Sequence, residues 1–165
     1  MYKRQGLGGG HTPETALRIM KDSRVGAFGV ISLILGLVLK FSLFLSLASQ
    51  TRGASALLLF PIISRWSMVL LAYLSPYART EGGLGQAMTL GISPRVLTGA
   101  GLSAGGLSLL ILGAPGLVLF IAAAALVWLG SLYFQRRLGG ITGDILGATN
   151  EVVEIMVLAG ALMLA

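Results

Sequence analysis

Five long runs of apolar residues, separated by short polar segments, dominate the pattern of the chain. The runs cover residues 25–47, 54–74, 96–112, 116–134 and 145–165. Because about 20 apolar helical residues cross the hydrocarbon of a bilayer, each run is long enough for one transmembrane helix. No run shows the period-two alternation of a transmembrane β-barrel. The pattern therefore predicts an all-α, polytopic membrane bundle of about five helices, one domain over residues 1–165, with residues 1–24 as a cytoplasmic lead-in.

Composition supports the membrane prediction and narrows the chemistry. Hydrophobic residues make up 55% of the 165-residue chain and charged residues 11%, whereas soluble domains carry about 25% charged residues. The chain contains no cysteine, which excludes thiol catalysis, cysteine-ligated metal centres and disulfide bonds.

The distribution of cations predicts which loops face the cytoplasm. Five crossings place residues 1–24, 75–95 and 135–144 on one side of the membrane. That side holds Lys3, Arg4, Arg18, Lys21, Arg24, Arg79, Arg95, Arg136 and Arg137, and the other side holds Arg52. Under the positive-inside rule the first side is cytoplasmic. The net charge of +6 then indicates contact with anionic membrane lipid and not with nucleic acid.

A first polar segment, residues 19–29, stands at the entry to the first apolar run. It contains Lys21, Asp22, Ser23 and Arg24 directly before a helix N-terminus. Helix N-termini favour anions, so this segment is a candidate phosphate site. The alternative is a basic membrane anchor in which Asp22 or Ser23 caps the helix.

A second polar segment, residues 139–154, places carboxylates inside the last apolar run. Asp144 and Glu151 share one helix face, and carboxylate oxygens suit Mg²⁺. Seven helical residues rise about 10.5 Å, so both could bind one ion only if the helix breaks near Gly147. The structural alternative is that Asp144 caps the helix while Glu151 or Glu154 pairs with Arg65.

Two further features carry charge. Residues 75–85 form a glycine-rich segment with Arg79, which either closes over a phosphate or is a plain surface loop. Within the apolar runs, Arg65 is placed to neutralise an acidic pocket. Lys40 lies near the far face of the membrane, and we expect its side chain to extend to that face.

These segments resemble the motifs of one family, the cobalamin synthases or adenosylcobinamide-GDP ribazoletransferases. Residues 21–29 are similar to the family's central motif, and residues 139–148 with Glu151 to its C-terminal motif. Residues 77–79, with Gly82, Gly83 and Gly85, match a third, weaker block. The similarity runs from about Gly6 to the end of the chain, in the family's order.

The resemblance implies a Mg²⁺-assisted phosphoryl transfer in the bacterial plasma (inner) membrane, with the motif loops cytoplasmic. The substrates implied are adenosylcobinamide-GDP and α-ribazole or its 5′-phosphate, with release of GMP. The implied phosphate-binding residues are Lys21, Ser23, Arg24, Arg79 and Thr142, and the implied metal ligands are Asp144, Glu151 and Asp22. No general base can be assigned, and association as a homo-oligomer is left open.

One departure from the family changes the expectation for this chain. The family's acidic N-terminal pattern, DG-x-ADT-x-DG, is absent. We therefore expect an N-terminally truncated sequence with weak or no activity by itself. Two alternative functions are a membrane phosphotransferase similar to the CDP-alcohol type and a non-catalytic transport subunit.

Overall fold

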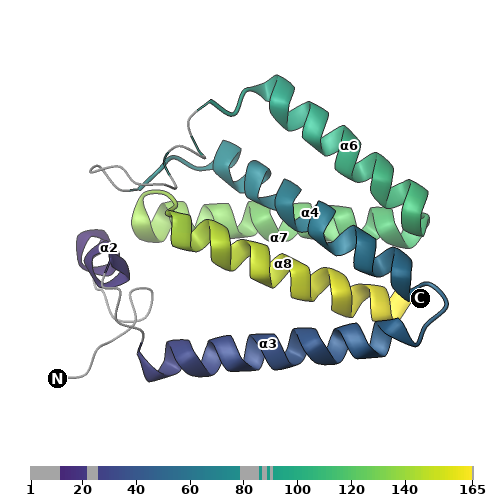
Figure 1. Cartoon of the computed structure of the whole chain (residues 1–165). Coiled ribbons are helices and arrows are strands. Elements are labelled where there is room, and N and C mark those ends of the chain that lie inside the picture. Colours follow the sequence, from purple (N-terminus) through teal and green to yellow (C-terminus); the bar gives the residue numbers. More distant parts are fainter. Residues whose placement is uncertain (1–11, 22–25, 79–85, 87–88, 90, 165) are drawn as a thin grey trace.

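The computed structural model describes residues 12–21, 26–78, 86, 89 and 91–164 (Figure 1). The helices in this part of the chain are α2 (Pro13–Lys21), α3 (Ala27–Ala48), α4 (Gly53–Leu74), α6 (Pro94–Leu112), α7 (Ala114–Leu138) and α8 (Gly143–Leu164). Except for α2, each is long and apolar enough to cross a membrane. No β-strand forms within the described ranges. The all-α prediction is confirmed, and the chain is a multi-pass membrane protein.

Local sequence explains where the helices begin and end. Ser93 caps α6, since its side chain accepts a hydrogen bond from the Val96 amide, and Pro94 occupies the first turn, where a missing N–H costs nothing. Gly139 ends α7 with a positive φ of 74°, a backbone conformation that favours glycine. The helix α7 therefore continues past the apolar run predicted at 116–134 and includes Arg136 and Arg137 in its last turn.

Helix α8 lies at the centre of the bundle and packs against α3, α4 and α7. Its buried positions include Val153, Val157 and Leu158, which are fully buried. A Cβ added at Gly160 would lie 2.5 Å from Leu119 Cδ2 of α7, so glycine permits this close contact. Small residues at helix contacts are typical of membrane bundles, where close packing and not water exclusion holds helices together.

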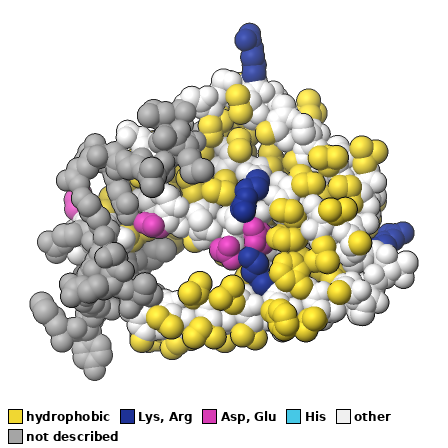
Figure 2. Space-filling view, viewed as in Figure 1, with side chains coloured by type: hydrophobic (Ala, Val, Ile, Leu, Met, Phe, Trp, Pro, Cys, Tyr) yellow, Lys and Arg dark blue, Asp and Glu magenta, His cyan; other side chains and the backbone are white. Residues whose placement is uncertain are grey.

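Large apolar side chains cover the outside of the bundle (Figure 2). Leu102, Leu110 and Met163 are among the most exposed, as expected for side chains that face lipid.

The alternating direction of the helices gives the bundle two ends. Helices α3, α6 and α8 begin, and α4 and α7 end, at the end where α2 lies (left in Figure 1). We call this the motif end. The opposite, far end holds the short connection at residues 49–52 and Gly113, which joins α6 to α7.

Candidate active site at the motif end

Two of the sequence motifs meet at the motif end through backbone hydrogen bonds. After α4 ends, the Ala78 amide donates to the Ile141 carbonyl at 2.8 Å, and the Ile141 amide donates to the Pro76 carbonyl at 2.9 Å. Tyr77 and Ile141 thereby form an isolated parallel bridge. The start of the glycine-rich segment is thus held against the C-terminal motif, although more than 60 residues of chain separate them.

Gly140 and Gln135 make this contact possible. A Cβ at Gly140 would lie 2.3 Å from the Pro76 carbonyl oxygen, closer than any side chain permits. From the last turns of α7, the Gln135 side chain donates through Nε2 to the Leu74 carbonyl at 2.9 Å and to Ser75 Oγ at 3.2 Å. Gln135 therefore holds the chain where α4 ends, directly before the residues that pair with Ile141.

Thr142 caps helix α8. Its side chain is fully buried, and its Oγ1 accepts a hydrogen bond of 3.4 Å from the Ile145 amide. Its carbonyl also accepts from the Leu146 amide at 3.1 Å. The cap is therefore Thr142, and Asp144 lies exposed in the first turn of α8. A carboxylate there interacts favourably with the positive end of the helix dipole.

The remaining predicted phosphate-binding residues lie largely outside the described part. Ser23, Arg24 and Arg79 are not described, nor is the predicted metal ligand Asp22. Of Lys21 the structure describes only its place as the last residue of α2. Helix α2 packs against α7 and buries Ala16 in the core. The elements that flank these residues therefore all lie at the motif end, and the residues' own roles stay predictions.

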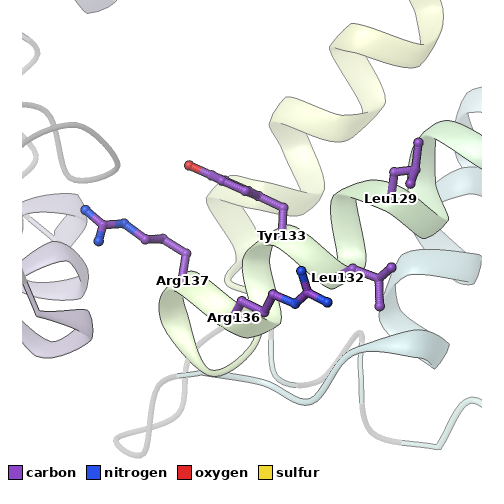
Figure 3. Close-up of a pocket in the computed structure, with 5 residues that line it drawn as sticks. All are labelled: Leu129, Leu132, Tyr133, Arg136 and Arg137. Atoms are coloured by element: carbon purple, nitrogen blue, oxygen red, sulfur yellow. The ribbon is translucent and has the colours of Figure 1, made fainter.

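The structure adds a basic hollow at the end of α7. A cavity of about 370 Å³ is lined by Leu129, Leu132, Tyr133, Arg136 and Arg137 (Figure 3). The two arginine side chains point to different sides of the helix in this view. In the sequence, both arginines indicated only the cytoplasmic side of the membrane. Their position one turn before Gly139 places additional positive charge beside the paired motif segments.

Deeper in the bundle, a polar cluster joins α3, α4 and α8. Glu154, whose side chain is 7% exposed, accepts from Lys40 Nζ at 2.5 Å through Oε2. Its Oε1 accepts from Asn150 Nδ2 at 2.8 Å and from Ser64 Oγ at 3.4 Å, and lies 3.5 Å from Arg65 Nη1. Arg65 Nη1 also donates to Asn150 Oδ1. We call these five residues, with Glu151, the charged cluster.

Two expectations for the charged cluster can be decided. The predicted pairing of Arg65 with a carboxylate of the last helix is confirmed by its contact with Glu154. The expectation that Lys40 extends to the far face is wrong. Lys40 Nζ instead binds Glu154 and, at 3.0 Å, Glu151, because an ion pair inside the bundle offsets the cost of burying its charge.

The predicted metal ligands are not gathered in the described part of the chain. No group of three or more acidic or histidine side chains there could hold a metal ion. Helix α8 is continuous from Gly143 to Leu164, so Glu151 lies about 10.5 Å along the axis from Asp144. Glu151 contacts Lys40. Its role as a metal ligand stays a prediction that no described contact supports.

The comparisons with known proteins agree with the motifs. The family model described as cobalamin-5-phosphate synthase matches residues 5–162. The chain belongs to the cobalamin-5-phosphate synthase family. No solved structure is significantly similar to this chain.

Three similar proteins are each named adenosylcobinamide-GDP ribazoletransferase. The chain is 46% identical over 159 residues to the adenosylcobinamide-GDP ribazoletransferase of Syntrophobacter fumaroxidans, covering 94% of this chain and 62% of the relative. It is 41% identical over 164 residues to the ribazoletransferase of the same name from Desulfitobacterium hafniense, covering 98% and 65%. For the Pseudomonas putida protein the identity is 44%, with coverage of 93% and 62%. The chain thus spans less than two thirds of the length of these relatives.

Proposed function

We propose that this chain is the part of an adenosylcobinamide-GDP ribazoletransferase that carries three of its motif segments. The reaction joins α-ribazole, or its 5′-phosphate, to adenosylcobinamide-GDP. A ribazole hydroxyl oxygen forms a bond to the cobinamide-linked phosphorus, the pyrophosphate P–O bond breaks, and GMP leaves. The family match and the names of its relatives support this proposal.

One structural observation carries the site proposal. The backbone bridge between residues 76–78 and Ile141 brings the two motif segments to one end of the bundle, beside the N-terminus of α8. Phosphoryl transfer depends chiefly on positioning and on neutralising charge. A helix N-terminus and nearby cations supply both for a pyrophosphate-bearing substrate. In the proposal, Lys21, Arg24, Arg79 and the hydroxyl of Ser23 bind phosphate oxygens. The predicted phosphate contact of Thr142 is not kept, because its side chain is fully buried and its hydroxyl caps α8.

Magnesium enters the proposal through Asp144. Mg²⁺ is commonly held by one or two carboxylates together with substrate phosphates, so a single exposed carboxylate at the N-terminus of α8 fits an ion carried in with the substrate. Asp22 is the second ligand in the proposal. The ion would supply charge neutralisation on the phosphates. Lipid surrounds the apolar helices, and the motif end faces the cytoplasm of the bacterial plasma membrane, in line with the bias of positive charge.

The test is an assay of the complete gene product that contains this sequence, reconstituted in liposomes. With adenosylcobinamide-GDP, α-ribazole and Mg²⁺, we expect release of GMP in proportion to the corrinoid consumed. Absence of GMP release would contradict the proposed reaction. Full activity of the Asp144→Ala variant would contradict the proposed site while leaving the reaction in place. The 165-residue chain assayed in parallel tests the expectation that it is weakly active by itself.

A further inference from the structure

The charged cluster lies far from the motif end, yet it connects the helices that carry the motifs. Lys40 is on α3, which follows the first motif, and Glu151 and Glu154 are on α8, which begins in the C-terminal motif. Since each residue of a helix rises about 1.5 Å, Lys40 lies about 20 Å from the start of α3. Glu154 lies about 17 Å from the start of α8 by the same measure. The Lys40–Glu154 pair is therefore too deep to contact a phosphate bound at the motif end.

Charged side chains at this depth require a reason. A lysine, arginine or aspartate near the centre of a membrane helix costs about 2.5–3.5 kcal/mol on insertion scales. An apolar contact between α3 and α8 would avoid that cost. A fixed ion pair differs from an apolar contact because it favours one register and one direction of approach, a role best known for buried polar groups between helices.

The burial of side chains along α3 shows which part of this helix depends on the ion pair for its position. Towards the far end, Leu43 and Leu47 are buried against the core, and the short connection at residues 49–52 ties α3 to α4. From Gly26 to Leu39, by contrast, no side chain is buried. Figure 1 shows α3 diverging from α8 towards the motif end. Among the described contacts, the ion pair of the partly buried Lys40 is therefore the interhelical polar contact nearest to residues 26–39 of the chain.

The space around the cluster agrees with this arrangement. A hollow of about 490 Å³ lies between α3 and α4, and its lining includes Lys40, Arg65 and Glu154. Figure 2 shows basic and acidic side chains gathered in the middle of the face turned to the reader, with a hollow beside them. The Lys40 side chain, 15% exposed, thus joins α3 to α8 at the edge of this hollow.

We infer that the Lys40–Glu154 ion pair is a positioning contact that fixes the direction of α3, and so the distance between the residues preceding α3 and the N-terminus of α8. The expected effect on activity rests on the proposed function, whereas the expected change in the direction of α3 does not. With about 20 Å of helix beyond Lys40, a tilt of roughly 10° moves Ala27 by about 3 Å. A misplacement of about 1 Å at reacting groups can cost 100-fold in rate.

Spin-label distances test the geometry. The chain has no cysteine, so Phe28→Cys on α3 and Gly147→Cys on α8 can be labelled selectively. Phe28 is 72% exposed, and a side chain at Gly147 meets nothing within 4 Å. In lipid nanodiscs, we expect Lys40→Met to shift or broaden the distance distribution by about 3 Å or more, by the lever estimate above, and Lys40→Arg to preserve it.

Two controls separate local repositioning from unfolding. A label pair at the far end, Leu45→Cys with Met163→Cys, should keep its distance in Lys40→Met, since α3 is packed there. Arg52→Met, which removes an exposed cation at the far end, should leave the motif-end distance unchanged. An unchanged motif-end distance in Lys40→Met would overturn the inference, as would loss of the far-end distance, because the ion pair would then hold the whole fold and not the direction of α3.

Activity of the complete gene product gives the second readout. We expect Lys40→Met to lower kcat/KM about 100-fold, and Lys40→Arg to restore most of it. A shifted distance with unchanged kcat/KM would overturn the positioning role. A wild-type protein without ribazoletransferase activity would contradict the proposed function, and the distance measurement would still decide the geometric claim.

Discussion

The contact between the two motif segments depends on the absence of a side chain at Gly140. In Gly140→Ala the new Cβ would lie 2.3 Å from the Pro76 carbonyl oxygen and 3.1 Å from the Ala78 amide nitrogen. Both neighbours are backbone atoms, so the segment must move. The movement breaks the two hydrogen bonds of 2.8 and 2.9 Å that join Ala78, Ile141 and Pro76. At about 0.5–1.5 kcal/mol each, their loss lowers the free energy of unfolding by about 1–3 kcal/mol.

The assay compares this variant with Gly147→Ala, in which the new methyl group meets nothing within 4 Å. Reversible unfolding in mixed detergent micelles, followed by far-ultraviolet circular dichroism, gives both free energies. We expect Gly147→Ala to be as stable as the wild type or up to about 1 kcal/mol more stable, since alanine favours helix. Equal stability of the two variants would refute the reasoning. We also expect Gly140→Ala to lower the rate of GMP release, because the motif segments separate.

Three further predictions concern single side chains. Thr142→Val removes the hydroxyl that caps α8 and should lower the free energy of unfolding by about 1 kcal/mol in the same assay. Thr142→Ser keeps a hydroxyl and should not; equal losses of stability in the two variants would contradict the capping role. Asp144→Asn should lower GMP release about 100-fold and raise the Mg²⁺ concentration required, and wild-type behaviour would remove Asp144 from the site. Gly160→Val places atoms against Leu119 and should lower the free energy of unfolding by about 1–3 kcal/mol through overpacking. Gly106→Val, where the space is open, should not; similar losses of stability in both variants would contradict the contact between Gly160 and Leu119.

The helices were predictable because lipid imposes a length and a composition on each. Their ends were less so. The apolar run predicted at 116–134 stops before the helix does, since Gln135, Arg136 and Arg137 continue α7 as polar residues. Gly139, which ends the helix, was the available signal, because glycine is common in the left-handed position after a helix.

Contacts between helices were predictable only where charge balance required them. The pairing of Arg65 with an acid of the last helix followed from two opposite charges inside apolar runs. The prediction for the Lys40 side chain was wrong because it followed from the position of Lys40 along the helix alone. The face of α3 on which Lys40 lies, towards α8, decides its contacts. Its partner Glu154 is 114 residues away in the chain, a separation that no periodic pattern reveals. The bridge at Ile141 uses backbone atoms, so residue types encode it only through the adjacent Gly140.

The central claim is that the three motif segments, residues 21–29, 77–85 and 139–148, converge at one end of the bundle. A distance between spin labels at Ser23→Cys and Gly147→Cys, measured in lipid nanodiscs, tests it directly. Because the helices of 22 residues are about 33 Å long, convergence predicts a distance of less than about half that length. A label at Ser49→Cys, at the far end, should lie farther from Gly147→Cys. A distance for Ser23→Cys that equals or exceeds the one for Ser49→Cys would contradict the claim.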